Sequence, residues 1–275
     1  MRHGLFFPPF GELSDPAVVV RLAEDAERSG WDGVFLWDHM IRPPGDPQAI
    51  ADPWILLAAI AVSTTRLALG TMITPLARRR PQKVARETAT LDHLSRGRVI
   101  FGVGLGVNTG GELERFGECA DQPRRAAMLD EALGLLFDLW SGNEVHHRGP
   151  SFTADGVRFL PTPLQQPRIP VWGAATGGRG RAGPLRRAAR LDGVFPVGTT
   201  VEQFREILEE LRVLRGSLDG YDLAAEVAFD AHSSTYDAFE DAGATWTLHS
   251  FGVHSTADDL RSAAARRPRA PERGT

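Results

Sequence analysis

The stretch Gly30-Trp31-Asp32-Gly33-Val34-Phe35-Leu36-Trp37-Asp38-His39 contains the unit from which the fold is built. Gly30 is typical of the end of a helix, and the segment before it carries apolar residues on one helical face. The run from Gly33 to Trp37 is short, apolar and rich in branched and aromatic residues, which favours a buried strand. Asp38 and His39 then place polar side chains directly after that strand. The stretch therefore predicts a helix, a strand and a polar loop in succession.

The same alternation continues in both directions along the 275 residues. Apolar runs predict strands at 3–8, 33–37, 66–73, 98–103, 169–173, 193–197, 226–230 and 244–249. Segments with helical periodicity follow each of them. Eight such units favour a closed (β/α)₈ TIM barrel of α/β class over an open doubly wound sheet. Periodicity does not show closure, so a large open α/β sheet remains the alternative.

The alternation predicts a single domain over residues 1–275 with one interruption. Residues 141–168 are rich in Gly, Pro and His and too long for an ordinary connection, so we expect an irregular insertion or covering loop there. Residues 266–275 are rich in Arg and Pro and are expected to form a flexible tail.

Composition excludes several classes of function. The net charge is −4 and the basic residues are spread along the chain, which argues against a nucleic-acid partner. No apolar run reaches the ~20 residues of a membrane span. Cys119 is the only cysteine and the first residues form a predicted strand and not a signal peptide, so the cytoplasm is the expected location. Lys83 is the only lysine and lies in a predicted surface helix, which excludes a Schiff-base mechanism.

Four segments together resemble the luciferase-like monooxygenase superfamily, which includes F420-dependent reductases and dehydrogenases. They are Gly30 to His39, Leu69-Gly70-Thr71-Met72-Ile73-Thr74-Pro75, Leu91-Asp92-His93-Leu94-Ser95-Arg96-Gly97-Arg98 with Gly102-Val103-Gly104-Leu105-Gly106, and Ile169-Pro170-Val171-Trp172-Gly173. The resemblance implies a barrel, often a homodimer, that uses FMN or coenzyme F420 on a small organic substrate. With FMN the expected reaction is monooxygenation, and with F420 it is hydride transfer without oxygen.

His39 is the candidate general acid or base, because an imidazole exchanges protons near neutral pH. The resemblance places the matching histidine beside the deazaflavin ring. Asp38 is expected to orient it. The alternative is that Asp38 caps a loop and His39 packs under Trp37.

Three further segments are candidates for cofactor binding. The resemblance implies a non-proline cis peptide at Thr71-Met72, behind the flavin ring, although a strand that simply ends before Pro75 is the alternative. Gly104 and Gly106 are expected to let the backbone approach a flat ring, and Asn108 to hydrogen-bond the cofactor. Val107 stands where sugar-phosphate dehydrogenases of the superfamily carry a catalytic glutamate, and Glu112 and Glu114 are expected to face solvent.

A loop between a strand and a helix is the candidate phosphate site. Its residues are Gly173, Ala174, Ala175, Thr176 and the following glycines, and its backbone N–H groups would contact the phosphate. Arg179 or Arg181 could pair with that phosphate. Gly198 and Thr199 are expected to close the same site, where a lysine of some F420-dependent relatives is missing. A flexible surface loop is the alternative.

No metal site is expected. His146 and His147 lack a ligand spacing and are expected to be exposed. His249 could line the pocket. The apolar residues near strand ends suggest a hydrophobic pocket, although such residues also suit a core. Two other functions remain open: a non-catalytic flavin-binding barrel protein, and an unrelated barrel hydrolase or isomerase.

Overall fold

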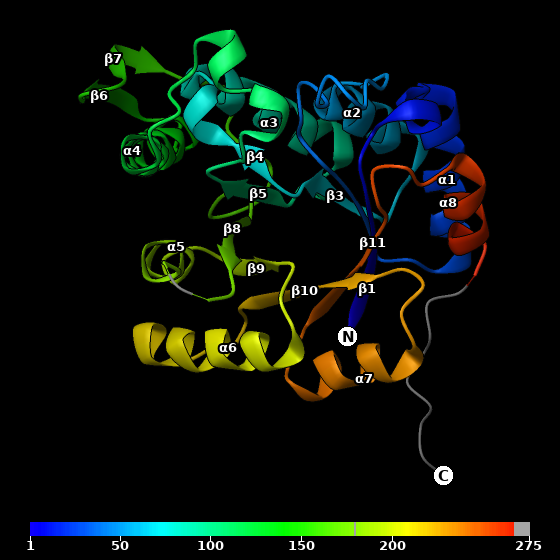
Figure 1. Ribbon diagram of the computed structural model, residues 1–275. Coiled ribbons are helices and arrows are strands. Elements are labelled where there is room, and N and C mark those ends of the chain that lie inside the picture. The colour runs from blue at the N-terminus through cyan, green and yellow to red at the C-terminus, as the bar shows by residue number, and fades with distance from the viewer. Residues whose placement is uncertain (179, 267–275) are drawn as a thin grey trace.

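The computed structural model describes residues 1–178 and 180–266, and its parallel strands form a barrel surrounded by helices (Figure 1). The barrel strands are β1 (Arg2–Phe7), β2 (Gly33–Leu36), β3 (Ala68–Thr71), β4 (Thr74–Pro75), β5 (Phe101–Gly104), β8 (Val171–Thr176), β9 (Gly193–Val197), β10 (Asp222–Ala228) and β11 (Trp246–Ser250). Strand β4 continues β3 after a two-residue interruption, so the strands correspond to the eight that the sequence predicts. The TIM-barrel prediction is confirmed.

One seam closes the sheet into a ring. The strand order runs β3-β2-β1-β11-β10-β9-β8-β5-β4. Across the remaining gap Leu69 forms a parallel bridge with Val99. The Leu69 N–H donates to the Arg98 carbonyl and the Ile100 N–H donates to the Leu69 carbonyl, both at 3.0 Å. At Gly70 an added Cβ would lie 1.8 Å from the Ile100 carbonyl oxygen, so only glycine allows this approach.

The helices lie outside the barrel (Figure 1). They are α1 (Pro16–Ser29), α2 (Pro53–Ser63), α3 (Pro81–Ser95), α4 (Gln122–Trp140), α5 (Ala182–Ala188), α6 (Val201–Arg215), α7 (Ser233–Asp241) and α8 (Ala257–Ala264). Asp15 and Asp52 accept backbone N–H groups at the starts of α1 and α2, and Thr200 forms a capping box with Gln203 at the start of α6. Among the helices of the described chain, none is both long and apolar enough to cross a bilayer.

Residues 141–168 contain regular structure that the sequence did not predict. Strands β6 (Glu144–Arg148) and β7 (Thr153–Arg158) form an antiparallel hairpin beside α4 (Figure 1). Glu131 of α4 holds it by accepting from the Ser151 and Phe152 N–H groups and by contacting His147 Nε2 at 3.1 Å. His146 is exposed, as expected, and contacts Glu144 and Asp155. The expectation of an irregular segment is wrong. The hairpin is stabilised by contacts with Glu131 of α4, which the sequence of residues 141–168 does not indicate. The tail beyond 266 lies outside the described residues.

Aromatic side chains fill the barrel. Phe35, Trp172 and Trp246 pack against one another with ring centroids 5.6–5.7 Å apart. All three are buried. Trp172 and Trp246 therefore belong to the core, whereas the sequence left open whether they line a pocket.

His249 lies on the outer side of β11, so the suggestion that it lines the pocket is wrong. Its ring stacks on Tyr236 and meets the edge of Trp31, each with centroids 4.7 Å apart, and its Nε2 lies 3.2 Å from His3 Nδ1. Burial, followed by the neighbouring His3, lowers the pKa of His249 from 6.5 to about 3. This histidine is therefore neutral in the folded chain throughout the physiological pH range.

The buried His249 predicts acid-sensitive stability. Its folded-state pKa lies below the unfolded value, so above about pH 7 both states are neutral and the group contributes nothing. As pH falls below 6.5, the unfolded chain takes up the proton first, and the free energy of unfolding falls by about 2 kcal/mol at pH 5. Urea denaturation at pH 7.5 and pH 5 measures this difference. We expect His249→Phe to reduce it and the exposed His254→Phe to retain it; an unchanged difference in His249→Phe would contradict the assignment.

Candidate active site

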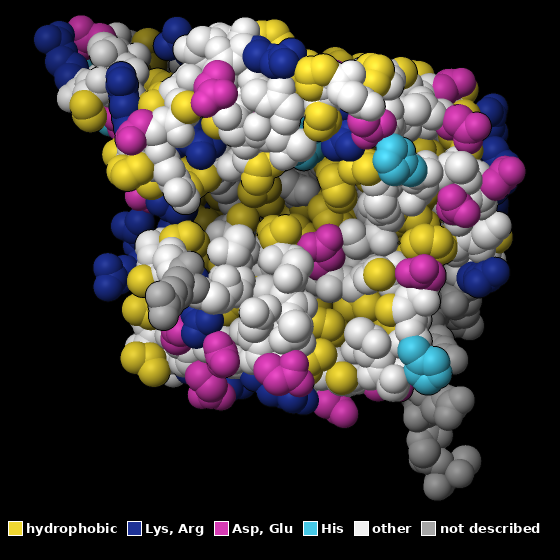
Figure 2. Space-filling model, viewed as in Figure 1, with side chains coloured by type: hydrophobic (Ala, Val, Ile, Leu, Met, Phe, Trp, Pro, Cys, Tyr) yellow, Lys and Arg dark blue, Asp and Glu magenta, His cyan; other side chains and the backbone are white. Residues whose placement is uncertain are grey.

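A pocket of about 610 Å³ opens at the carboxyl ends of the barrel strands. This end carries the functional loops in TIM barrels, and the volume is typical of a small-molecule site. Figure 2 shows a hollow at the centre of the viewed face, with mostly hydrophobic side chains in it. The pocket is lined by Phe6, Trp37, Asp38, His39, Met72, Ile73, Pro75, Gly104, Leu105, Gly106, Val107, Glu112, Gln122, Ala174, Ala175, Thr176, Gly180, Pro184, Arg187, Phe195, Val197 and Glu226.

The structure brings many of the sequence-predicted residues to this pocket. Asp38, His39, Met72, Gly104, Gly106, Ala174, Ala175 and Thr176 line it. Thr71, Asn108, Gly173, Arg181, Gly198 and Thr199 lie outside the lining, and Arg179 lies outside the described residues. None of residues 141–168 contributes to the lining of this pocket, and the covering role expected for that segment stays a prediction.

The end of β3 forms one wall of the pocket. The peptide bond between Met72 and Ile73 is cis, so the non-proline cis peptide implied at this strand end is present, one bond beyond Thr71-Met72. Both residues line the pocket. Thr71 is buried, and its Oγ1 lies 2.5 Å from Thr74 Oγ1 across the interruption between β3 and β4.

The glycines after β5 lie close against this wall. A Cβ at Gly104 would lie 2.2 Å from Ile73 Cδ1, and one at Gly106, which has φ of +68°, would lie 2.7 Å from Pro75 Cβ. The sequence attributed these glycines to the approach of a flat ring. The structure adds a second reason, because the missing side chains also make room for the chain that follows β3.

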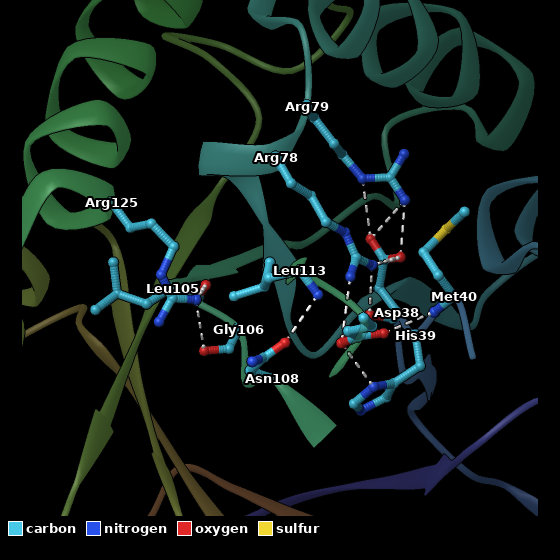
Figure 3. A network of polar contacts seen from close by, with 11 residues as sticks. Asp38, His39, Met40, Arg78, Arg79, Leu105, Gly106, Asn108, Leu113 and Arg125 are labelled. Carbon is cyan, nitrogen blue, oxygen red and sulfur yellow. Dashed lines mark hydrogen bonds and ion pairs between the residues drawn. The ribbon is translucent and has the colours of Figure 1, made fainter. Parts of the chain in front are cut away.

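Asn108 and Arg125 shape the loop after β5. Asn108 Oδ1 accepts the Leu113 N–H at 2.9 Å, and Arg125 of α4 donates to the Leu105 carbonyl at 3.0 Å (Figure 3). The carboxamide oxygen of Asn108 is therefore engaged within its own loop.

Asp38 is held by two arginines from the segment after β4. Arg78 donates to Asp38 Oδ1 at 3.0 Å, and Arg79 donates to Oδ1 and Oδ2, both at 2.7 Å. In Figure 3 both guanidinium groups point toward Asp38. The Asp38 side chain is 1% exposed. The expectation that Asp38 orients His39 is wrong, because its oxygens are engaged by arginines that sequence reasoning missed.

Glu112 is the carboxylate that contacts His39. Its Oε1 lies 3.1 Å from His39 Nδ1, and its Oε2 accepts the Met40 N–H at 2.9 Å. The Glu112 side chain is 1% exposed, so the expectation that it faces solvent is wrong. The order of the strands could have indicated this contact. The loops after β2, β4 and β5 meet at one rim of the barrel, and they supply Asp38 and His39, Arg78 and Arg79, and Glu112.

The surroundings of Glu112 favour its charged form. Burial alone would raise the pKa of this carboxyl, but the hydrogen bonds with His39 and Met40 and the nearby positive charge of Arg78 outweigh it. The pKa of Glu112 therefore lies below its usual value. Arg78 Nη1 lies 3.3 Å from Glu112 Oε1. Since Arg78 also pairs with Asp38, it joins the carboxylates of Asp38 and Glu112 into one charged cluster.

The opposite side of the pocket holds the predicted phosphate loop. Ala174, Ala175 and Thr176 at the end of β8 line the pocket, and α5 follows. The Arg181 side chain instead pairs with Glu206 and Glu210 of α6, at 3.1 and 2.6 Å. In this structure its guanidinium is therefore engaged away from the pocket.

Two more charged side chains line this side. Arg187 pairs with Asp130 through two bonds of 2.6 and 2.9 Å. Glu226 at the end of β10 accepts the Gly198 N–H at 2.9 Å and the Ser250 hydroxyl at 2.7 Å. Within residues 1–178 and 180–266, no group of three or more His, Cys, Asp or Glu side chains is placed to hold a metal ion.

Comparison with known sequences finds relatives among F420-dependent enzymes. The chain is 32% identical over 169 residues to the F420-dependent glucose-6-phosphate dehydrogenase of Nakamurella multipartita, covering 60% of this chain and 48% of that protein. It is 34% identical over 163 residues to the F420-dependent hydroxymycolic acid dehydrogenase of Mycobacterium tuberculosis, covering 58% and 44%. The chain thus spans about half the length of these curated relatives.

Solved structures share the fold. An F420-dependent secondary alcohol dehydrogenase in complex with an F420-acetone adduct matches with a TM-score of 0.77 and 20% identity, over 96% of this chain and 99% of that one. The monooxygenase RslO1 from Streptomyces bottropensis matches with a TM-score of 0.78 and 21% identity, over 96% of both chains. The model of the luciferase-like monooxygenase family matches residues 1–273. With the barrel, the non-proline cis peptide and this match across the chain, the protein belongs to the luciferase-like monooxygenase family.

Proposed function

We propose that this protein is an F420-dependent oxidoreductase that transfers a hydride to or from a small organic substrate, with His39 as general acid or base. The observation that carries the proposal is the His39–Glu112 pair at the wall of an apolar pocket. A histidine held by a buried carboxylate is a common arrangement for proton transfer.

The pocket fits a tricyclic cofactor with a phosphate tail. Its lining combines apolar side chains with Gly104, Gly106 and the segment from Ala174 to Thr176, whose side chains are absent or small. We propose that Met72 and Ile73 support the ring, and that the backbone of the loop after β8 contacts the phosphate. A bound deazaflavin would supply the hydride chemistry, while the residues of this chain orient the substrate and exclude water.

F420 is preferred to FMN because the curated relatives described above are F420-dependent dehydrogenases. An FMN-dependent monooxygenase is the second candidate, supported by the family as a whole. The alternative to both enzymes is a non-catalytic protein that binds F420 or FMN and turns over no substrate.

We propose an uncharged substrate and not a sugar phosphate. Among the described lining residues, the permanently cationic side chain is Arg187, and both of its bonds go to Asp130. Val107 also replaces the glutamate that the sugar-phosphate branch carries.

We propose a homodimer and a cytoplasmic location, as the sequence suggested. Helix α2 leaves Ile55 and Val62 70% and 67% exposed on one face, which suits contact with a second copy. Light scattering that shows only monomers at micromolar concentration would contradict the dimer.

Cofactor titration tests the proposal. The purified chain is mixed with F420 or with FMN, and binding is followed by fluorescence quenching. We expect F420 to bind, and its reduction to follow when a panel of small alcohols is added without oxygen. Tight FMN binding with oxygen consumption supports the second candidate, and binding of neither cofactor contradicts both.

A further inference from the structure

The contacts of Glu112 restrict how His39 is protonated. Glu112 Oε2 accepts the Met40 N–H at 2.9 Å, so Oε1 is the oxygen that faces His39 Nδ1, at 3.1 Å. Arg78 approaches Oε1 to 3.3 Å and donates to Asp38, which also binds Arg79. Glu112 links the imidazole to this cluster of four charged groups, and Phe10 and Trp37 pack near its ring.

An ionised carboxylate can only accept hydrogen bonds. The low pKa of Glu112 and its positive neighbour Arg78 keep it ionised near neutral pH. A neutral imidazole carries one N–H, and a contact with an acceptor requires that N–H to be on the contacting nitrogen. The other nitrogen then carries the lone pair.

We propose that Glu112 is a positioning residue that holds His39 as the Nδ1–H tautomer, so that Nε2 is the atom available to accept a proton. Within the described chain the His39 ring makes its hydrogen bond through Nδ1, and its side chain is 20% exposed at the pocket. The formal charges of Arg78, Arg79, Asp38 and Glu112 cancel, so the cluster is balanced while the imidazole is neutral. The use made of Nε2 rests on the proposed function; the tautomer does not.

The substitution Glu112→Gln is a sharp test because glutamine has one acceptor oxygen and one donor NH₂ group. The Met40 N–H remains a donor in every state and makes a hydrogen bond of 2.9 Å, whereas Arg78 Nη1 approaches the other oxygen to 3.3 Å without a hydrogen bond, so the Met40 N–H binds the glutamine oxygen. The NH₂ group then faces His39 Nδ1, which must become an acceptor. The structure therefore predicts that this substitution inverts the tautomer to Nε2–H.

The experiment is ¹⁵N NMR on the cofactor-free chain labelled at histidine, in which protonated and lone-pair ring nitrogens have separate chemical shifts. The His39 signals are identified by their loss in His39→Gln. We expect Nδ1–H in the wild type at pH 8, Nε2–H in Glu112→Gln, and no change in Glu114→Gln, an exposed glutamate of the same loop.

A wild-type spectrum with Nε2–H overturns the proposal, even if Glu112→Gln does not fold, and so does an unchanged tautomer in Glu112→Gln. Turnover separates this proposal from the proposed function. If His39 is the base, Glu112→Gln lowers kcat about 10²-fold to 10⁴-fold, with KM little changed. An inverted tautomer with full turnover supports the role of Glu112 and contradicts that of His39.

Discussion

Replacing His39 by alanine is expected to lower turnover about 10²-fold to 10⁴-fold, the range that a positioned acid or base contributes. The dissociation constant of the cofactor should change much less, because the ring of His39 forms only one part of a wide lining. Stopped-flow measurement of cofactor reduction, with a separate binding titration, distinguishes the two effects. In the wild type the imidazole is hydrogen-bonded to Glu112. His39→Ala therefore leaves an empty space beside the Glu112 carboxylate.

That space makes a chemical rescue possible. Imidazole added to His39→Ala is expected to restore part of the lost turnover, with an increase that depends on the concentration of the neutral base. The exposed His146 on the distant hairpin provides the matched control, and His146→Ala should keep wild-type turnover. Full turnover in His39→Ala would remove His39 from the chemistry, whereas a wild-type chain that binds the cofactor without any turnover would favour the carrier alternative.

The fold was largely predictable because its signals are local. Each barrel strand is a short apolar run, and caps such as Asp15 and Thr200 mark the helices that follow. The strand near 226–230 was misplaced: β10 spans Asp222–Ala228, because its pairing with β9 and β11 outweighs the weak strand preference of its alanines. The seam at Gly70 depends on a contact with Ile100, which no local pattern indicates.

The candidate site was predictable in position but not in pairing. The sequence placed His39 and Asp38 at the correct rim because they follow a strand. It did not find Glu112, which lies 73 positions from His39. It also assigned Asp38 to His39, although neighbours in sequence on an extended segment point apart. Which carboxylate meets which base is decided by how three loops converge, and that is information only the tertiary structure contains.

The second large effect concerns stability. Asp38→Asn is expected to lower the free energy of unfolding by about 3–5 kcal/mol, because it removes the charge that compensates two arginines. The Asp38, Arg78 and Arg79 side chains are 1%, 6% and 19% exposed, so water has little access to replace the lost partner. Arg78 retains Glu112 at 3.3 Å, whereas Arg79 loses the only ion pair found for it in the described chain. Urea denaturation of the cofactor-free chain measures the change.

The exposed ion pair between Asp25 and Arg28 provides a control for the predicted loss of stability in Asp38→Asn. Asp25 pairs with Arg28 on α1 with both side chains largely accessible, so Asp25→Asn should change stability by no more than about 1 kcal/mol. A loss of similar size in Asp38→Asn would show that the arginines find water or another partner.

A double-mutant cycle then tests the cause of the loss. If the cost in Asp38→Asn comes from an uncompensated Arg79, then Arg79→Gln should destabilise the Asp38→Asn background less than it destabilises the wild type. The difference between the two is the coupling energy of the pair. Equal costs in both backgrounds would show that Asp38 acts through Arg78 and Glu112 alone. Because Glu112 also contacts His39, Asp38→Asn would then be expected to alter the ¹⁵N shifts of His39 as well, which links the charge balance of the cluster to the proton-accepting nitrogen in the pocket.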